Sequence, residues 1–207
     1  YAEARAKFLA AAQARGCAVE SHVHPSARGA EGEPLAMDVA TVGRMDADAI
    51  LVVTSATHGV EGFCGSGCQV ALLGDDAFAA AVDATGVAVT FVHAVNPYGF
   101  SHLRRTNEDN VDLNRNFRAF SPPPARNGAY AEVHPMLVPD AWPPTPENEA
   151  RIAAYMALHG AIAYQTAVSS GQCEHADGLF YGGTKPAWSN GMLRGVLRQL
   201  GRSRRKL

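Results

Sequence analysis

The sequence contains little that would place it in a specialised class of protein. Its formal net charge is only −2, so no strong positive field indicates binding to nucleic acid or to an anionic membrane. No apolar run approaches the ~20 residues that a membrane-spanning helix needs. The four cysteines are scattered, which argues against a disulfide scaffold and makes the cytoplasm the default compartment. The one basic run, residues 202–206, is interpreted as a solvated terminus.

What is present is the composition of an ordinary globular protein. Hydrophobic residues make up 47% of the 207 residues, which is enough for one domain with a substantial core. Neither an internal repeat nor a linker is visible, so we expect residues 1–207 to belong to a single domain.

Apolar runs alternate with segments of helical periodicity along the chain. The continuous apolar run at residues 49–54 is typical of a buried strand in a largely parallel sheet, and the segments 87–95 and 163–169 are interpreted as two more buried strands. Further strands are predicted at 17–23, 35–42 and 178–181, and helices at 2–14, 62–73, 75–82, 145–159 and 189–200. The polar stretch 96–142 has the length of a functional or disordered loop. This alternation predicts an α/β fold with a mixed sheet.

The segment HGVEG, residues 58–62, follows one predicted strand and precedes a predicted helix. In such α/β sheets, ligands bind beyond the carboxyl ends of the strands. The imidazole of His58 and the carboxylate of Glu61 are both zinc ligands, and the glycine between them lets both side chains face one point. The alternative is that His58 forms a hydrogen bond at the end of the strand. Glu61 would then be an acidic residue of the first turn of the helix, where the helix dipole favours negative charge.

The segment DLNRNF, residues 112–117, offers groups suited to binding a carboxylate. Arg115 can pair with a carboxylate through two hydrogen bonds, and the amide of Asn114 can donate another. Upstream, Arg104 and Arg105 can polarise a carbonyl and stabilise its oxyanion. The alternative for this run alone is an Asx-rich turn with exposed arginines.

Together, HGVEG, NPYGF at residues 96–100, the run 103–117 and GLFYGG at 178–183 resemble the carboxypeptidase A-like zinc peptidases. The resemblance is closest to a bacterial carboxypeptidase-like branch, once classed as a domain of unknown function. That branch is related to the succinylglutamate desuccinylase and aspartoacylase group. The resemblance implies a three-layer α/β/α sandwich around a mixed, mainly parallel sheet of eight strands.

The resemblance also implies roles for individual residues. Zn²⁺ would be the cofactor, with His58 and Glu61 as its first two ligands. Arg104 would be the catalytic arginine that assists polarisation of the carbonyl, with Arg105 as the second candidate. A matching pair, Asn114 and Arg115, would bind the terminal carboxylate of the substrate.

The chain departs from this family's pattern near its end. The family's third zinc ligand is a histidine beyond a helix that matches residues 188–200, and its general base is a glutamate near the C-terminus. Neither has a counterpart before Leu207, and the chain does not begin with Met. We therefore expect an incomplete domain, truncated at the C-terminus and at the front, with little or no activity. His175 is an alternative third ligand, or else a histidine of the substrate cleft, whereas His93 is interpreted as a core histidine or one that supports a ligand.

The sequence therefore predicts a zinc-dependent hydrolase of the carboxypeptidase type, which cleaves an amide bond next to a free carboxylate. Its substrate would be a small peptide, cut at the C-terminus, or an N-acyl amino acid. No nucleic-acid or membrane partner is expected. The alternative is a non-catalytic protein that keeps the carboxylate grip of Arg115 without the metal chemistry.

Overall fold

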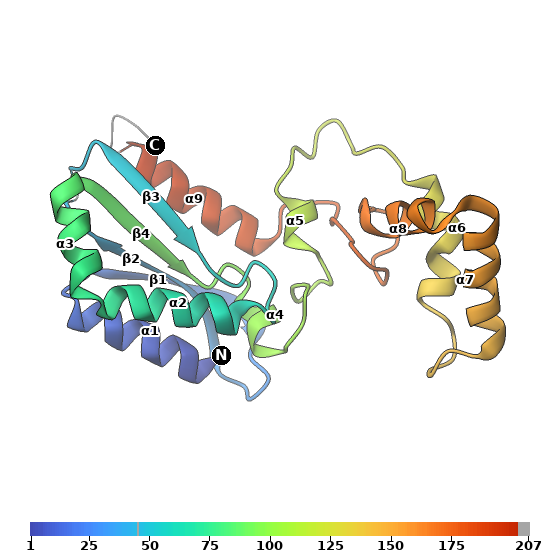
Figure 1. The fold of residues 1–207 in the computed structure, drawn as a ribbon, viewed down its shortest axis with the longest axis horizontal. Helices are drawn as coiled ribbons and strands as arrows, with labels where there is room; N and C mark the ends of the chain where they lie inside the picture. Colours follow the sequence, from blue (N-terminus) through green and yellow to red (C-terminus); the bar gives the residue numbers. More distant parts are fainter. Residues whose placement is uncertain (45, 203–207) are drawn as a thin grey trace. The chain divides into compact units, whose positions relative to one another are not determined.

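The computed structural model describes residues 1–44 and 46–202, which divide into two compact units (Figure 1). The first unit comprises Tyr1–Glu108 and the helix that begins at Trp188, and the second comprises Asp109–Ala187. Residues 203–206 of the predicted basic terminus lie outside the described residues. None of the helices in the described part of the chain has the length and hydropathy needed to cross a membrane.

The first unit is built on a four-stranded sheet. Its strands are β1 (Val19–Arg28), β2 (Pro34–Val42), β3 (Ala49–Thr54) and β4 (Val87–His93), in the spatial order β1-β2-β4-β3. The sheet is mixed, as predicted, because β3 and β4 are parallel while β1–β2 and β2–β4 are antiparallel. Two of the three described pairings are thus antiparallel, where the resemblance implied a mainly parallel sheet. The strand at 49–54 is present as predicted, but it lies at the sheet edge, so Leu51 is 53% exposed and not buried.

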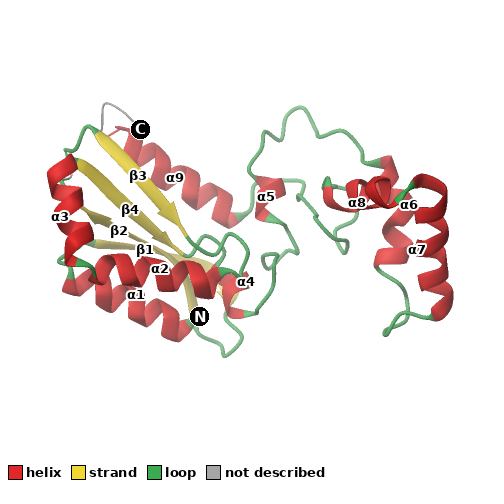
Figure 2. Ribbon diagram, viewed as in Figure 1, coloured by secondary structure: helices red, strands yellow, loops and turns green. Residues whose placement is uncertain are grey.

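Helices cover both faces of this sheet, which confirms the predicted α/β/α layering (Figure 2). Alternate residues of a strand point to opposite faces. On one face, Ala40 and Val42 of β2 share a core with residues of α1 (Ala2–Ala14), α2 (Gly62–Gly74) and α3 (Asp76–Thr85). On the other face, Val39 lines a cavity together with Val196 and Leu200 of α9 (Trp188–Arg202). Figure 1 shows α9 on the far side of the sheet from α1 and α2.

The loops that leave β3 and β4 run side by side beyond the sheet. Ser55 N–H donates to the carbonyl of Val92, and Val95 N–H donates back to the carbonyl of Ser55. One step further, Asn96 N–H donates to the carbonyl of Ala56 at 2.9 Å. The parallel pairing of the two strands is therefore extended into their loops, and it brings HGVEG and NPYGF together. NPYGF itself opens the short helix α4 (Pro97–Ser101).

The second unit is helical and contains α5 (Leu113–Asn116), α6 (Gly128–Leu137), α7 (Pro146–His159) and α8 (Ala161–Ser169). The predicted helix α7 is confirmed, with the hydroxyl of Thr145 capping its first turn. The prediction of loops throughout 96–142 missed α6, which begins after Asn127, a residue whose side chain accepts a hydrogen bond from Tyr130 N–H.

The predicted strands in the second unit were wrong. Residues 163–169 form part of α8, because Tyr164, Ala167 and Val168 pack into one core at the i, i+3, i+4 spacing of a helix. The segment is short and mixes apolar residues with Gln165, Thr166 and Ser169, so its sequence does not separate a buried strand from a helix. At residues 178–181 there is one isolated bridge, between Gln172 and Tyr181, and no named strand.

Candidate functional site

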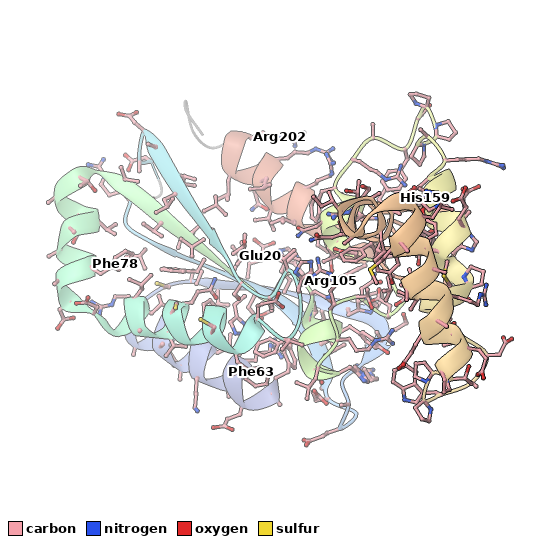
Figure 3. All side chains as sticks on the ribbon, turned by 45° about the vertical axis from the view of Figure 1, so that its right-hand side comes forward. Glu20, Phe63, Phe78, Arg105, His159 and Arg202 are labelled. Carbon is pink, nitrogen blue, oxygen red and sulfur yellow. The ribbon has the colours of Figure 1, made fainter. Side chains whose placement is uncertain are left out.

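The glycines of HGVEG and NPYGF allow the two loops to pack against each other. A side chain at Gly59 would overlap the backbone carbonyl of Gly99, and one at Gly62 would come within 2.7 Å of the Phe100 ring. Phe63, labelled in Figure 3, packs edge-on against the same ring with 5.0 Å between centroids. The glycines of both motifs and the ring of Phe100 therefore have a packing role, which the chemistry of the motifs alone does not reveal.

His58 and Glu61 face each other where this loop enters α2. Nδ1 of His58 lies 3.3 Å from Oε1 of Glu61, with the imidazole largely covered and the carboxylate 64% exposed. Two ligands of one tetrahedral zinc ion, each bonded at ~2.0–2.2 Å, lie about 3.4 Å apart. The donor set and this separation therefore fit two ligands of a zinc site, and the same separation fits a direct contact between the imidazole and the carboxylate. Among the described residues of the first unit, no further His, Cys, Asp or Glu joins the pair to make a group of three.

The backbone of the arginine segment is held against the same loop. The carbonyl of Arg104 accepts a hydrogen bond from Gly59 N–H at 3.1 Å. The carbonyl of Arg105 accepts a long hydrogen bond, 3.4 Å, from the amide of the fully buried Asn96. Both arginine side chains are exposed. The structure thus places the main chain of Arg104 next to the residue that follows His58.

His93 lies in the core beneath these loops, as one of its two sequence interpretations predicts. Its ring is fully buried and stacked on Phe8, with 4.6 Å between centroids. Nε2 lies 2.8 Å from the hydroxyl of Ser66, and Nδ1 has no hydrogen-bond partner among the described residues. Burial lowers the pKa of His93 from its ordinary 6.5 to about 4, so the ring is neutral at pH 7.

In the second unit, the predicted carboxylate pair lies on α5, one turn capped by Asp112. Nη2 of Arg115 donates to the carbonyl of Ser169 at 2.7 Å, and the guanidinium lies 5.5 Å from the centre of the Phe180 ring. Its Nε is buried without a hydrogen-bond partner in the described chain. The side chain of Asn114 is exposed. Arg115 is therefore fixed in orientation and keeps one buried donor for a further acceptor.

Sequence reasoning missed the structural role of the second asparagine in this motif. The fully buried amide of Asn116 donates to the carbonyls of Gly182 and Lys185, at 2.9 and 3.0 Å, and accepts from Ala187 N–H at 2.9 Å. These bonds tie α5 to the segment that contains the GLFYGG motif. The motif DLNRNF contains this residue, but the sequence alone does not show which of its two asparagines is buried.

His175 lies in a group with His134 and Asp177, whose ligand atoms are all within 4.8 Å of one another. His134 comes from the last turn of α6, whereas the other two residues come from the loop after α8. No signal in the sequence could have paired His134 with His175, because α6 itself was not predicted. Neither His134 nor Asp177 was among the expected site residues.

The fold and these motifs define an α/β protein with a mixed sheet and polar loops beyond two parallel strands. The chain belongs to DUF2817, a family of proteins of unknown function that it matches over residues 1–207. The predicted membership of such a branch is thereby confirmed. No curated protein matches the chain.

Among solved structures, the chain is similar to a metallo-carboxypeptidase from Burkholderia cenocepacia, at 24% identity and a TM-score of 0.40, over 55% of this chain and 31% of that one. A candidate carboxypeptidase from Burkholderia mallei is similar at 24% identity and a TM-score of 0.40, over 55% and 30% of the two chains. The glutaminyl cyclase of Porphyromonas gingivalis is similar at 20% identity and a TM-score of 0.28, over 44% and 36%. The matched region covers less than two fifths of each of these three proteins.

Proposed function

We propose that this chain carries the metal-binding and carboxylate-binding parts of a zinc-dependent hydrolase of the carboxypeptidase type. The observation that carries the proposal is the convergence of His58 Nδ1 and Glu61 Oε1 at 3.3 Å, beyond the carboxyl end of β3. That is the edge at which α/β sheets bind ligands. The reaction would cleave an amide bond next to a free carboxylate, in a small peptide or an N-acyl amino acid.

His58 and Glu61 would hold the zinc ion. When bound, zinc supplies a Lewis acid and lowers the pKa of a coordinated water to near 7. The side chain of Arg104 would donate to the oxygen of the scissile carbonyl as negative charge develops there, with Arg105 as the neighbouring donor. The hydrogen bond from Gly59 N–H to the carbonyl of Arg104 supports this role, since it holds the arginine segment beside the zinc-binding loop.

Arg115 would bind the carboxylate of the substrate, and Asn114 would add a hydrogen bond. The contacts of Arg115 with Ser169 and Phe180 orient the guanidinium and leave its buried Nε without a partner. A carboxylate oxygen is the acceptor that such a donor binds most strongly. Both a peptide C-terminus and an N-acyl amino acid present this group, so both remain in the proposed substrate class.

The first arm of the test measures zinc affinity, on the untagged 207-residue chain, by competition with a chromophoric chelator. All variants carry His175→Gln, so that the group around His175 does not contribute. We expect His58→Ala and Glu61→Gln each to weaken zinc binding by at least about tenfold, because each removes a ligand. The matched control Glu31→Gln changes another exposed acid of the first unit and should leave the affinity unchanged.

The second arm compares binding of an N-acetyl amino acid with binding of its uncharged amide. We expect the carboxylate form to bind more tightly, and Arg115→Gln to remove that preference, whereas Arg151→Gln, on the exposed face of α7, keeps it. Zinc binding that is indifferent to His58 and Glu61 would refute the hydrolase. If carboxylate preference survived alongside that result, a non-catalytic carboxylate-binding protein would replace it.

A further inference from the structure

The group of His134, His175 and Asp177 in the second unit has the composition of a metal centre. In residues 1–44 and 46–202, it is the one place where three or more potential ligand side chains converge. Two imidazoles and a carboxylate are a donor set that suits zinc and its neighbours better than magnesium or calcium, which prefer oxygen ligands alone. The group is separate from the His58–Glu61 pair in sequence and in its supporting residues.

The distances between these side chains fit ligands of one shared metal ion better than direct hydrogen bonds between the side chains. Nε2 of His134 lies 3.6 Å from Oδ1 of Asp177, too far for a hydrogen bond and close to the ~3.4 Å that separates two ligands of a tetrahedral ion. The rings of His134 and His175 are stacked, with 4.0 Å between centroids and 27° between planes. Since all three ligand atoms lie within 4.8 Å, small side-chain rotations would bring them to bonding distance.

The loop that carries two of these ligands is rigidly built. The buried side chain of Gln172 accepts from the N–H of Glu174 and His175, and donates to the carbonyl of His175 at 2.7 Å. At the far end of the loop, the hydroxyl of the buried Tyr130 accepts from Leu179 N–H at 2.6 Å. Tyr130 precedes His134 by one helical turn, so the same helix face anchors the loop and presents a ligand to it.

The two ring nitrogens of His134 lie in different surroundings. Nδ1 of His134 is buried and has no hydrogen-bond partner among the described residues. An ion shared with Asp177 would bind Nε2, the nitrogen that lies 3.6 Å from the carboxylate, and Nδ1 would keep no partner among the described residues.

We propose that His134, His175 and Asp177 form a binding site for a divalent transition metal, best suited to Zn²⁺, which links α6 to the loop after α8. The site stands independently of the proposed hydrolase. That loop lies between Ser169 and Phe180, the two residues that contact the guanidinium of Arg115. A bound ion would therefore stiffen the surroundings of Arg115 as well as the second unit itself.

The test uses the untagged chain with His58→Ala, which removes one ligand of the His58–Glu61 pair in the first unit. Zn²⁺ is measured by elemental analysis after dialysis, and Co²⁺ is used as a spectroscopic probe. We expect one Zn²⁺ per chain, a thermal unfolding temperature that rises with added Zn²⁺, and cobalt absorption bands without a contribution from thiolate. Asp177→Asn should weaken zinc binding by at least about tenfold, and His134→Gln with His175→Gln should abolish it.

Two controls keep the result decisive. Asp140→Asn changes another exposed carboxylate of the second unit and should leave zinc affinity unchanged. The Asp177 side chain is 67% exposed, so its variant is expected to fold even if the double histidine variant does not. The proposal is overturned if the His58→Ala chain binds no Zn²⁺, if Asp177→Asn and Asp140→Asn bind it equally well, or if Co²⁺ shows a thiolate charge-transfer band, which would assign the metal to cysteine.

Discussion

The buried His93 makes the first unit sensitive to mild acid. In the unfolded chain this histidine takes up a proton as the pH falls below its ordinary pKa of 6.5, whereas in the folded chain it stays neutral until the pH approaches 4. Between these values the unfolded state binds more protons, so stability falls as the pH is lowered. From pH 7 to pH 5, this single group should cost about 2 kcal/mol of unfolding free energy.

The perturbation that isolates this effect is the double variant His93→Leu with Ser66→Ala. Leucine has a similar volume and does not titrate, and alanine avoids leaving the Ser66 hydroxyl buried without the bond that it now shares with Nε2. The variant should lose about 2 kcal/mol less stability than the wild type between pH 7 and pH 5. Its absolute stability at pH 7 does not enter the comparison.

The assay is urea unfolding at both pH values, with a chelator present so that metal binding does not contribute. The chain has two tryptophans, and Trp142 is 84% exposed. In a Trp142→Phe background, fluorescence therefore reports Trp188 and, through it, the first unit. Ser66→Ala alone and His102→Gln are the controls, and both should keep the wild-type pH dependence. Equal losses of stability in the wild type and the His93→Leu double variant would refute the argument.

Three further predictions concern packing and hydrogen bonds, and all are measured by urea unfolding. Gly59→Ala should cost about 1–3 kcal/mol or more, because the new methyl group overlaps the backbone of Gly99. Gly67 lies on the exposed face of α2, and no atom lies within 4 Å of an added Cβ. Gly67→Ala should therefore stabilise the protein by about 0.5–1 kcal/mol, and a loss of stability in this variant would contradict the packing argument. Asn116→Ala should cost at least about 2 kcal/mol, since three backbone groups, two of them in buried residues, lose a partner. The exposed Asn114→Ala should change stability by less than about 0.5 kcal/mol, and similar costs for the two variants would show that burial does not separate them.

Local features of the sequence predicted much of the first unit and one helix of the second. The apolar run 49–54 became β3 with the same bounds, and the predicted strand at 87–95 contains the whole of β4, which ends at His93. Thr145 followed by Pro146 and two acidic residues marked the start of α7 correctly. These signals succeed because they depend on a few neighbouring residues. An apolar run marks a strand locally, and a capping side chain marks the first turn of a helix.

The same kind of signal failed elsewhere in the second unit. The segment 163–169 is short and mixes apolar with polar residues, so its period does not separate a strand from a helix. The segment is helical because a helix that packs against α6 and α7 buries Tyr164, Ala167 and Val168 in one core. The helix α6 was not predicted because it lies in a polar stretch whose prolines and glycine favour loops, although Asn127 provides a capping side chain.

The sequence by itself determined which chemical groups the chain offers and in what order: a His–Glu pair after a strand, two arginines, and an Asn–Arg pair. The tertiary structure alone decided that Gly59 meets Gly99, that Arg115 rests on Ser169 and Phe180, and that His134 meets His175 and Asp177. The physical reason is the range of the interactions. Capping and periodicity act within a few residues, whereas these contacts join segments that only the packing of helices and strands brings together.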